Sequence, residues 1–325
     1  RRHVADNLGP RVQTCLCSRV RDQILTQNQR QQHPILQPLP WVSSPGNVDG
    51  YFDVGRTLAT NVSVAGATER MHGRFGVSRL DQNGMVPGFT LERTNLTFAG
   101  GLDATDRLNI NTSVQYVEQE GNNRPGVGYD ENNPMQQFVW FGREVDTDLL
   151  RQRYRDVRGA DEAQSGLPYS WNYSYHPNPY YLQLVNSNFD TRDRLIGQLS
   201  ANYQFTSWLN GMVRTATDWY EDARKKTYAQ DNFGGPYTTN PLTSAREYVQ
   251  PSGAFATWDL GFQEVNTDFL LTANPELDLP FTTNFMLGGN RRDWERSHDY
   301  VWVGELATPG IFNVSYAAVT PVSAA

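Results

Sequence analysis

The stretch that decides the fold is residues 195–205, which read LIGQLSANYQF. Apolar or small side chains occupy every second position, and the positions between them, after the first, carry amide or hydroxyl groups. The chain then turns at Thr206 and Ser207, and a second alternating run begins at Trp208. Period-two alternation predicts β-strands with one apolar and one polar face. A hydratable second face is what a membrane β-barrel with a wet lumen requires.

Three other stretches repeat this design of two alternating runs joined by a polar turn. Their paired arms are residues 58–64 and 71–77, residues 94–102 and 108–116, and residues 265–273 and 281–287. Each run, with its flanks, is about 9 to 13 residues long, the length that a tilted strand needs to cross a hydrocarbon layer. We therefore expect eight antiparallel strands, with a ninth segment near residues 311–316.

The connections between these runs alternate in length. The long ones are a loop of about a dozen residues around Asn83 and Gly84, one of about seventy from 118 to 192, and one of about forty from 220 to 263. Short turns on one side and long loops on the other are typical of an outer-membrane barrel, with periplasmic turns and extracellular loops.

The composition excludes several classes of protein. The chain has 325 residues, of which 38% are hydrophobic, and its mean hydropathy is -0.60. No window approaches the roughly 20 apolar residues of a membrane helix. A net charge of -7 argues against nucleic acid as a partner. Residues 1–40 are rich in Gln and Arg without alternation, so we expect them to be poorly ordered, with the partial barrel at 41–325; for Cys15 and Cys17 in this segment we expect no function.

The expected polar face argues for a wide barrel. Its side chains are hydratable and of medium size, and would have to pack against one another in the narrow core of a closed eight-stranded barrel. They are Asn109, Asn111, Ser113, Gln115, Gln198, Ser200, Asn202, Asn266, Asp268, Asn284 and Asn290. We therefore expect eight or nine strands of a larger barrel.

Several stretches between roughly residues 40 and 325 match one known family when taken together. They are residues 51–66, Arg74 and Phe75, LDQNGMVP at 80–87, NRPGVG at 123–128, NPMQQFVWFG at 133–142 with Arg143, Val145 and Asp146, NYSYHPNPYY at 172–181, residues 193–197, residues 208–220 and PGIFNVS at 309–315. In these stretches the sequence resembles the SusC/RagA family of TonB-linked outer-membrane proteins.

The resemblance implies a 22-stranded barrel filled by an amino-terminal plug and energised by the TonB complex. It also implies a SusD-like surface lipoprotein as partner and the import of oligosaccharides or peptides across the outer membrane. The plug and its TonB-contacting segment are not matched within this chain. We therefore expect the family function to belong to a longer parent protein, with outer-membrane lipid around it.

The long loop from 118 to 192 concentrates aromatic residues. We predict that some contact a substrate or a partner, because aromatic faces bind apolar CH surfaces while their polar tips stay hydrated. The alternative is that they pack the loop on itself or on the lid partner. The candidates are Trp140, Phe141, Trp171, Tyr173, Tyr175, Tyr180 and Tyr181. Within the same loop, residues 145–155 have apolar residues at helical spacing, which predicts a short amphipathic helix.

A second aromatic group lies near the expected strand ends and is predicted to form the girdle at the membrane interfaces. It comprises Tyr203, Phe205, Trp208, Trp219 and Tyr220. Arg214 and Asp218 share one face of a strand, and we interpret them as an ion pair in the lumen, as a plug contact or as ordinary hydrated positions.

The sequence predicts no enzyme. No G-x-S-x-G, H-E-x-x-H or P-loop pattern occurs, and nothing fixes the spacing of acidic pairs such as Asp218 with Glu221 and Asp222 for glycoside hydrolysis. We expect no catalytic residue, no metal and no cofactor. Two alternatives to active transport stay open: a passive, porin-like channel, and a soluble glycan-binding β-sheet module.

Overall fold

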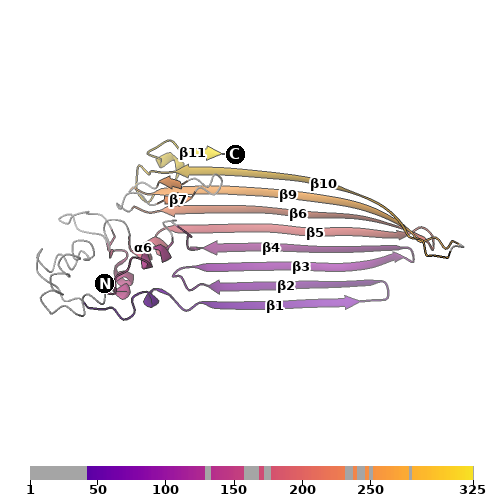
Figure 1. Cartoon of the computed structure of the whole chain (residues 1–325), viewed down its shortest axis with the longest axis horizontal. Coiled ribbons are helices and arrows are strands. Elements are labelled where there is room, and N and C mark those ends of the chain that lie inside the picture. Colours follow the sequence, from indigo (N-terminus) through magenta and orange to yellow (C-terminus); the bar gives the residue numbers. More distant parts are fainter. Residues whose placement is uncertain are drawn as a thin grey trace, which may run out of the picture.

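The computed structural model describes residues 42–128, 133–156, 168–171, 177–230, 237–239, 246–248, 252–277 and 280–324. These residues form an all-β fold around one open antiparallel sheet of nine strands, in the order β1-β2-β3-β4-β5-β6-β9-β10-β11 (Figure 1). The strands are β1 (Arg56–Ala67), β2 (Met71–Asn83), β3 (Thr90–Thr105), β4 (Leu108–Asn122), β5 (Ser187–Gln204), β6 (Leu209–Tyr228), β9 (Ala254–Ala273), β10 (Phe285–Val303) and β11 (Val322–Ala324). A separate pair, β7 (Tyr237–Thr239) and β8 (Arg246–Tyr248), lies in the second long connection. The expectations for residues 1–40 fall outside the described residues.

The four predicted hairpins are confirmed, and three of their turns use the same device. Thr68, Thr105 and Thr206 each accept a hydrogen bond on Oγ1 from the backbone N–H three residues later, at 3.1, 3.0 and 3.0 Å. A hydroxyl that bonds the backbone in this way stabilises a tight turn. Because these turns fix which residues face each other, they set the register of the sheet.

The two faces of the sheet differ as the alternation predicts. One register row, the set of residues opposite one another across the sheet, runs Val62, Val77, Leu96, Tyr116, Leu195, Trp219. A row on the other side, five positions away along β4, runs Asn111, Ser200, Arg214, Asp268, Asn290. We call these sides the apolar face and the polar face. The polar positions expected within the strands all share the polar face.

Large side chains of the apolar face are exposed. Phe75, Phe98 and Leu199 keep 50%, 45% and 49% of their surface. Exposure of this kind over many strands is unusual for a soluble monomer, whose apolar patches rarely exceed a few hundred Å².

The structure departs from the sequence prediction at several strand ends. β5 begins at Ser187 and β9 at Ala254, before any alternation is visible. The return arm of the fourth hairpin begins at Phe285, not at 281, so the predicted arm is four residues too long at this end. The segment at 311–316 is not a strand: it contains the 3-10 helix η2 (Val314–Tyr316), and the ninth strand is β11.

The predicted alternation of connection lengths is only partly correct. The connections 123–186 and 229–253 are long, and both lie at the end of the sheet that we call the loop end. The connection Gly84–Phe89 at the same end is shorter than the turn 274–284 at the opposite end. Gly88 has φ +76°, a left-handed conformation that glycine adopts without strain and that keeps this connection compact.

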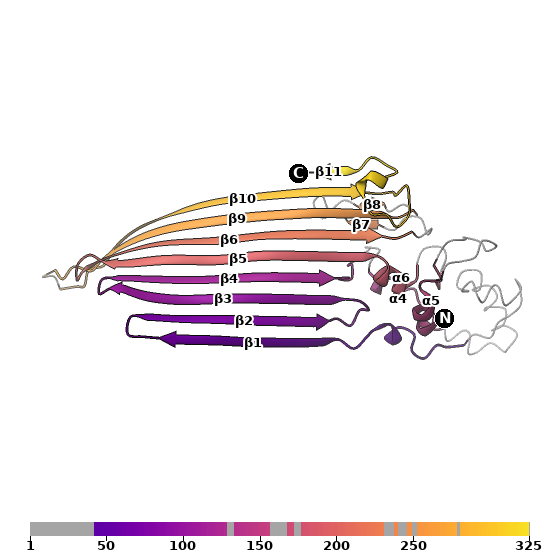
Figure 2. The same ribbon diagram turned by 180° about the vertical axis from the view of Figure 1, so that it is seen from behind.

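The described helices are short and gather at the loop end (Figure 2). Besides η2 they are η1 (Asp49–Tyr51), α4 (Met135–Phe138), α5 (Thr147–Arg153) and α6 (Pro179–Leu184). Within the described ranges, every helix is too short to span a membrane.

Candidate functional site

Beside the sheet, at its loop end, aromatic residues form a small core that we call the loop cluster. Tyr51 and Tyr180 are completely buried, with ring centroids 4.8 Å apart, and Phe138 meets Tyr51 edge to face at 4.9 Å. The cluster's buried members are Tyr51, Val145, Leu150, Tyr169, Trp171 and Tyr180. Residues far apart in the sequence therefore share a core of the kind that soluble proteins have.

Hydrogen bonds fasten the segment before β1 to this cluster. The Asn47 side chain donates to the carbonyls of Val145 at 2.8 Å and Gly142 at 3.0 Å. The Tyr180 hydroxyl donates to the Gly50 carbonyl at 3.2 Å. Burial raises the pKa of Tyr180 to about 12 and raises that of Tyr51 well above its usual range.

Two side-chain caps shape the helices of the cluster. Asp146 accepts from the N–H of Leu149 at 3.0 Å and caps α5, whose Leu150 is buried, so the amphipathic helix predicted at 145–155 is confirmed over 147–153. Asn178 caps α6 and donates to the carbonyls of Leu150 and Tyr169 at 2.9 and 3.0 Å.

The predicted contact residues fall into different settings. Phe141, Trp171 and Tyr180 belong to the packing of the loop cluster, and the Trp171 indole donates to Gln137 at 3.1 Å. Tyr181 donates from its hydroxyl to the Gln230 carbonyl at 2.8 Å, and Trp140 is 65% exposed. Tyr173 and Tyr175 lie outside the described residues. Contact of any of these residues with a substrate or partner stays a prediction.

The expected girdle residues occupy both faces of the sheet. Tyr203 and Phe205 pack edge to face at 4.9 Å near the third turn, with Trp208 beside them, and Trp219 lies on the apolar face opposite Leu195. Tyr220 lies on the polar face, because neighbouring positions of a strand point to opposite sides. It is opposite Arg194 there, whereas Trp219 lies on the other side. A place for these residues at a membrane interface stays a prediction.

Ion pairs cross the strands on the polar face. Arg194 pairs with Asp218, and Arg214 with Asp268, each at 2.6 Å. Arg292 and Glu264 are 2.5 Å apart. The suggested pairing of Arg214 with Asp218 is wrong: each residue finds its partner on a neighbouring strand, directly opposite or one position along the face.

One group on this face departs from pairing one to one, and the sequence reading missed it. Asp222, 3% exposed at its side chain, lies between Arg192 and Arg224. The Arg192 Nε donates at 2.9 Å, and the Arg224 Nε at 2.5 Å. Both arginine side chains remain about one-third exposed, at 38% and 36%.

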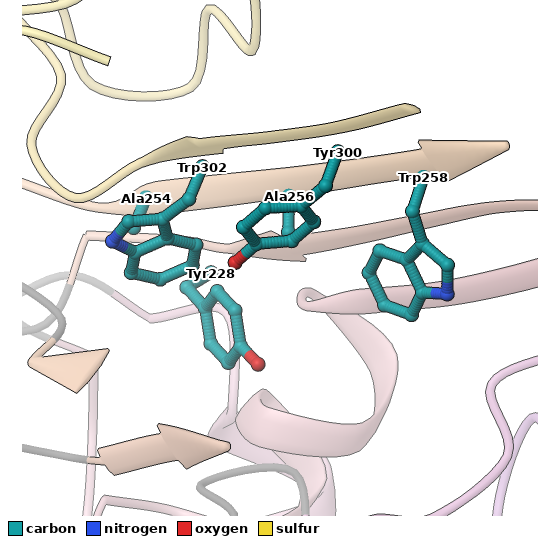
Figure 3. Close-up of a cluster of buried hydrophobic side chains, with 6 residues drawn as sticks. All are labelled: Tyr228, Ala254, Ala256, Trp258, Tyr300 and Trp302. Carbon is teal, nitrogen blue, oxygen red and sulfur yellow. The ribbon is translucent and has the colours of Figure 1, made fainter. Parts of the chain in front are cut away.

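A second buried cluster lies on the polar face at the loop end (Figure 3). The rings of Tyr228 and Trp302 pack edge to face with their centroids 6.0 Å apart, and the ring centroids of Trp258 and Tyr300 are 6.4 Å apart. The cluster comprises Tyr228, Ala254, Ala256, Trp258, Tyr300 and Trp302. Because the strands end here beneath the long connections, we expect their large polar-face rings to lie near the mouth of the lumen.

The described residues contain no group of three or more His, Cys, Asp or Glu that could hold a metal ion. The chemistry available on the polar face is hydrogen bonding, ion pairing and aromatic contact.

No protein-family model matches the chain, and no curated protein matches its sequence. Solved structures of the RagAB peptide importer do match in three dimensions. The "open-open" state has a TM-score of 0.61 at 11% identity and covers 98% of this chain and 34% of its own. The "closed-closed" state has a TM-score of 0.57 at 10% identity and covers 92% and 32%.

A further structure of the RagAB peptide transporter has a TM-score of 0.55 at 12% identity and covers 82% of this chain and 28% of that chain. The present chain therefore spans about a third of the length of the chains it matches. At such low identity the likeness concerns the fold alone. This chain thus has, over most of its length, the fold of part of a RagAB importer chain, and the expected SusC/RagA-type resemblance is confirmed at that level.

Proposed function

We propose that this chain forms part of the wall of an outer-membrane, TonB-dependent importer of peptides or oligosaccharides. The observation that carries the proposal is the separation of the sheet into an exposed apolar face and a hydrated, ion-paired polar face. The apolar face would contact outer-membrane lipid, and the polar face would line the lumen. The likeness to peptide importers favours peptides as the first substrate class to test.

The apolar face has the height that lipid contact requires. The apolar-face positions from Leu195 on β5 to Phe205 just after it span roughly 33 Å at about 3.3 Å per residue. With a strand tilt of about 45°, that length gives a band about 23 Å tall, close to the apolar band of about 25 Å in outer-membrane barrels.

The polar face carries ion pairs along its length, as the hydrated wall of a lumen would. Its ion pairs extend from the level of Arg292 and Arg214 to that of Arg192 near the long connections. In the proposed importer a plug domain of the full protein occupies the lumen and contacts TonB, and a SusD-like lipoprotein covers the loop end. The exposed Trp140 of the long loop is a candidate contact for that lipoprotein or for substrate.

The experiment is an uptake assay with the protein from its full gene, expressed with its own export signal in a Gram-negative host. Fluorescent oligopeptides and oligosaccharides are offered to cells with and without TonB, and outer membranes are fractionated in parallel. The proposal expects the protein in the outer membrane and TonB-dependent uptake of one of the two classes.

Two results would refute the proposal and identify an alternative. Uptake that is equal without TonB, together with large conductance in a planar bilayer, would show a passive channel. Recovery as a compact monomer in buffer without detergent would show a soluble module and would end the assignment of Leu199 and Phe75 to lipid.

A further inference from the structure

We propose that the polar face carries a binding site for a carboxylate group, formed by Arg192, Arg224 and the indole N–H of Trp258. The inference rests on the proposed function, since it assumes that substrate passes along this face. It adds the chemical class of substrate, which is one that bears a carboxylate.

The group formed by Asp222, Arg192 and Arg224 carries more positive than negative charge. Asp222 is the carboxylate shared by two guanidinium groups, with Arg224 donating to both of its oxygens at 2.5 and 2.9 Å. Each of the other cross-strand pairs on this face, such as Arg214 with Asp268, balances one charge with one. Asp190, which lies opposite Arg224 on the same face, has its own partner in Arg124 at 2.7 Å. The Asp222 group therefore retains one excess positive charge, on arginine side chains that solvent still reaches.

The indole N–H of Trp258 is a buried hydrogen-bond donor without an acceptor among the described residues. Trp258 is 5% exposed, and its buried Nε1 has no hydrogen-bond partner among the described residues. Buried polar atoms are nearly always paired in native structures, so this donor needs an acceptor. Trp258 lies opposite Arg224 in the register of β6 and β9, on the same face.

The N–H of Trp258 points toward the charged group on the polar face. Figure 3 shows the Trp258 nitrogen at the end of the ring farthest from the other five residues of its cluster. Those residues lie in the register row of Arg224 or nearer the loop end, so the N–H is directed toward the next row, which contains Asp222, Leu260 and His298. Leu260 packs against the cluster, and Asp222 is the member of this row that the two arginines hold. Indole and guanidinium donors thus converge on one part of the polar face.

Two stacked aromatic rings lie beside these donors on the polar face. Tyr220 and Phe262 stack with their centroids 5.3 Å apart, and the Arg192 guanidinium lies 5.2 Å from the Tyr220 ring. A planar guanidinium held in this way presents N–H donors that match a carboxylate. The ring pair can contact the apolar carbon atoms next to that carboxylate. A ligand with only neutral hydroxyl groups would not compensate the excess positive charge.

Two kinds of ligand carry such a group: a peptide with a free carboxyl terminus and an acidic oligosaccharide. The test measures equilibrium binding to the full-length protein purified in detergent. The probes are a labelled hexapeptide, its carboxyl-terminal amide, an oligogalacturonate and its methyl ester. The variants are Arg224→Gln, Trp258→Phe and, as a matched control from a balanced pair on the same face, Arg214→Gln.

We expect one acid to bind at least tenfold more tightly than its neutral counterpart. Arg224→Gln should abolish that preference, because Arg192 alone then balances Asp222. Trp258→Phe keeps the ring and removes the donor, so it should lower the preference several-fold, and Arg214→Gln should leave it unchanged. Which acid shows the preference identifies the source of the carboxylate.

Equal binding of acid and neutral probes by the wild-type protein would overturn the site, and so would equal losses in Arg224→Gln and Arg214→Gln. TonB-dependent uptake of the neutral probes at the same rate as the acids would overturn it while leaving the proposed function intact. Circular dichroism of each variant is compared with that of the wild-type protein, so that only variants with unchanged β-sheet content are used to judge the site.

Discussion

The sheet and the loop cluster both contain large aromatic and aliphatic residues, but they treat them in opposite ways. Tyr51 and Tyr180 of the loop cluster are fully buried, whereas Phe75 and Leu199 on the sheet keep about half of their surface. The cluster is complete within the chain, as the core of a soluble domain is. The apolar face of the sheet is exposed among the described residues, and in the proposed importer outer-membrane lipid covers it.

This difference means that a substitution of the same type should act differently in the two regions. In the loop cluster, a loss of apolar volume should loosen a local core. On the sheet, the effect should depend on the surrounding medium. An added charge should lower stability on the apolar face, which would contact lipid, and change it little on the hydrated polar face.

The largest expected effect is that of Tyr51→Ala, which empties the centre of the loop cluster. Truncating a buried aromatic side chain costs about 3–5 kcal/mol. Amide hydrogen exchange should therefore rise across 42–55, α5 and α6, while β3 to β6 keep their protection. Tyr51→Phe, which keeps the ring and loses only a 3.5 Å contact of its hydroxyl with the Pro179 carbonyl, is the control. Equal loss of protection in the sheet would show that the two regions are not independent.

The next effect sharpens the contrast between the faces of the sheet. Leu199→Lys puts a charge in the middle of the apolar face and should destabilise the membrane-inserted protein by about 2–4 kcal/mol. Ser200→Lys, one residue on and facing the other side, should change stability little. Urea unfolding in lipid vesicles measures both. Similar losses for both lysines would mean that the faces share one environment.

Sequence reasoning predicted the hairpins well because their signals are local: alternation within each arm and a threonine at three of the turns. It stopped short at Ser187–Arg194 of β5, where both faces carry polar residues and the alternation disappears although the hydrogen-bond ladder continues. It also mispaired Arg214, because the true partner, Asp268, is known only once β6 and β9 are in register.

The loop cluster was harder to predict for a related reason. Its defining bonds join Asn47 to Val145 and Tyr180 to Gly50, about a hundred residues or more apart and without periodicity. The aromatic residues of the long loop could be named, but which of them turn inward depends on the segment before β1. The same limit applies to the unsatisfied donor of Trp258, which only three-dimensional placement shows.

Alkaline pH should destabilise the loop cluster more than the sheet, by less than the substitutions above. The pKa of Tyr180 is about 12 when folded and about 10 when unfolded, so its contribution to stability is complete below pH 10 and is lost as the pH rises from 10 through 12. This residue should weaken the loop cluster by roughly 1 kcal/mol at pH 11. Tyrosinate absorbance together with hydrogen exchange follows the change. Tyr180→Phe should remove this part of the pH dependence, and an unchanged profile in that variant would contradict the assignment.

The smallest expected effect belongs to the balanced ion pairs. Arg214→Gln should change stability by less than about 1 kcal/mol, because the arginine is half exposed and Asp268 keeps its bond from Asn290. Thermal unfolding in detergent measures this difference. A loss as large as that of Leu199→Lys would show that the polar face is far less hydrated than its composition indicates.

The most direct test of the central claim is a nitroxide scan of residues 195–204 in the full-length protein reconstituted in lipid bilayers. Collision rates with oxygen, which concentrates in lipid, and with a water-soluble nickel chelate are measured at each position. The structure predicts a period of two, with oxygen access highest at odd-numbered positions such as Leu199 and nickel access highest at even-numbered ones such as Ser200. Uniform access to the nickel chelate, without alternation, would contradict the assignment of the apolar face to lipid.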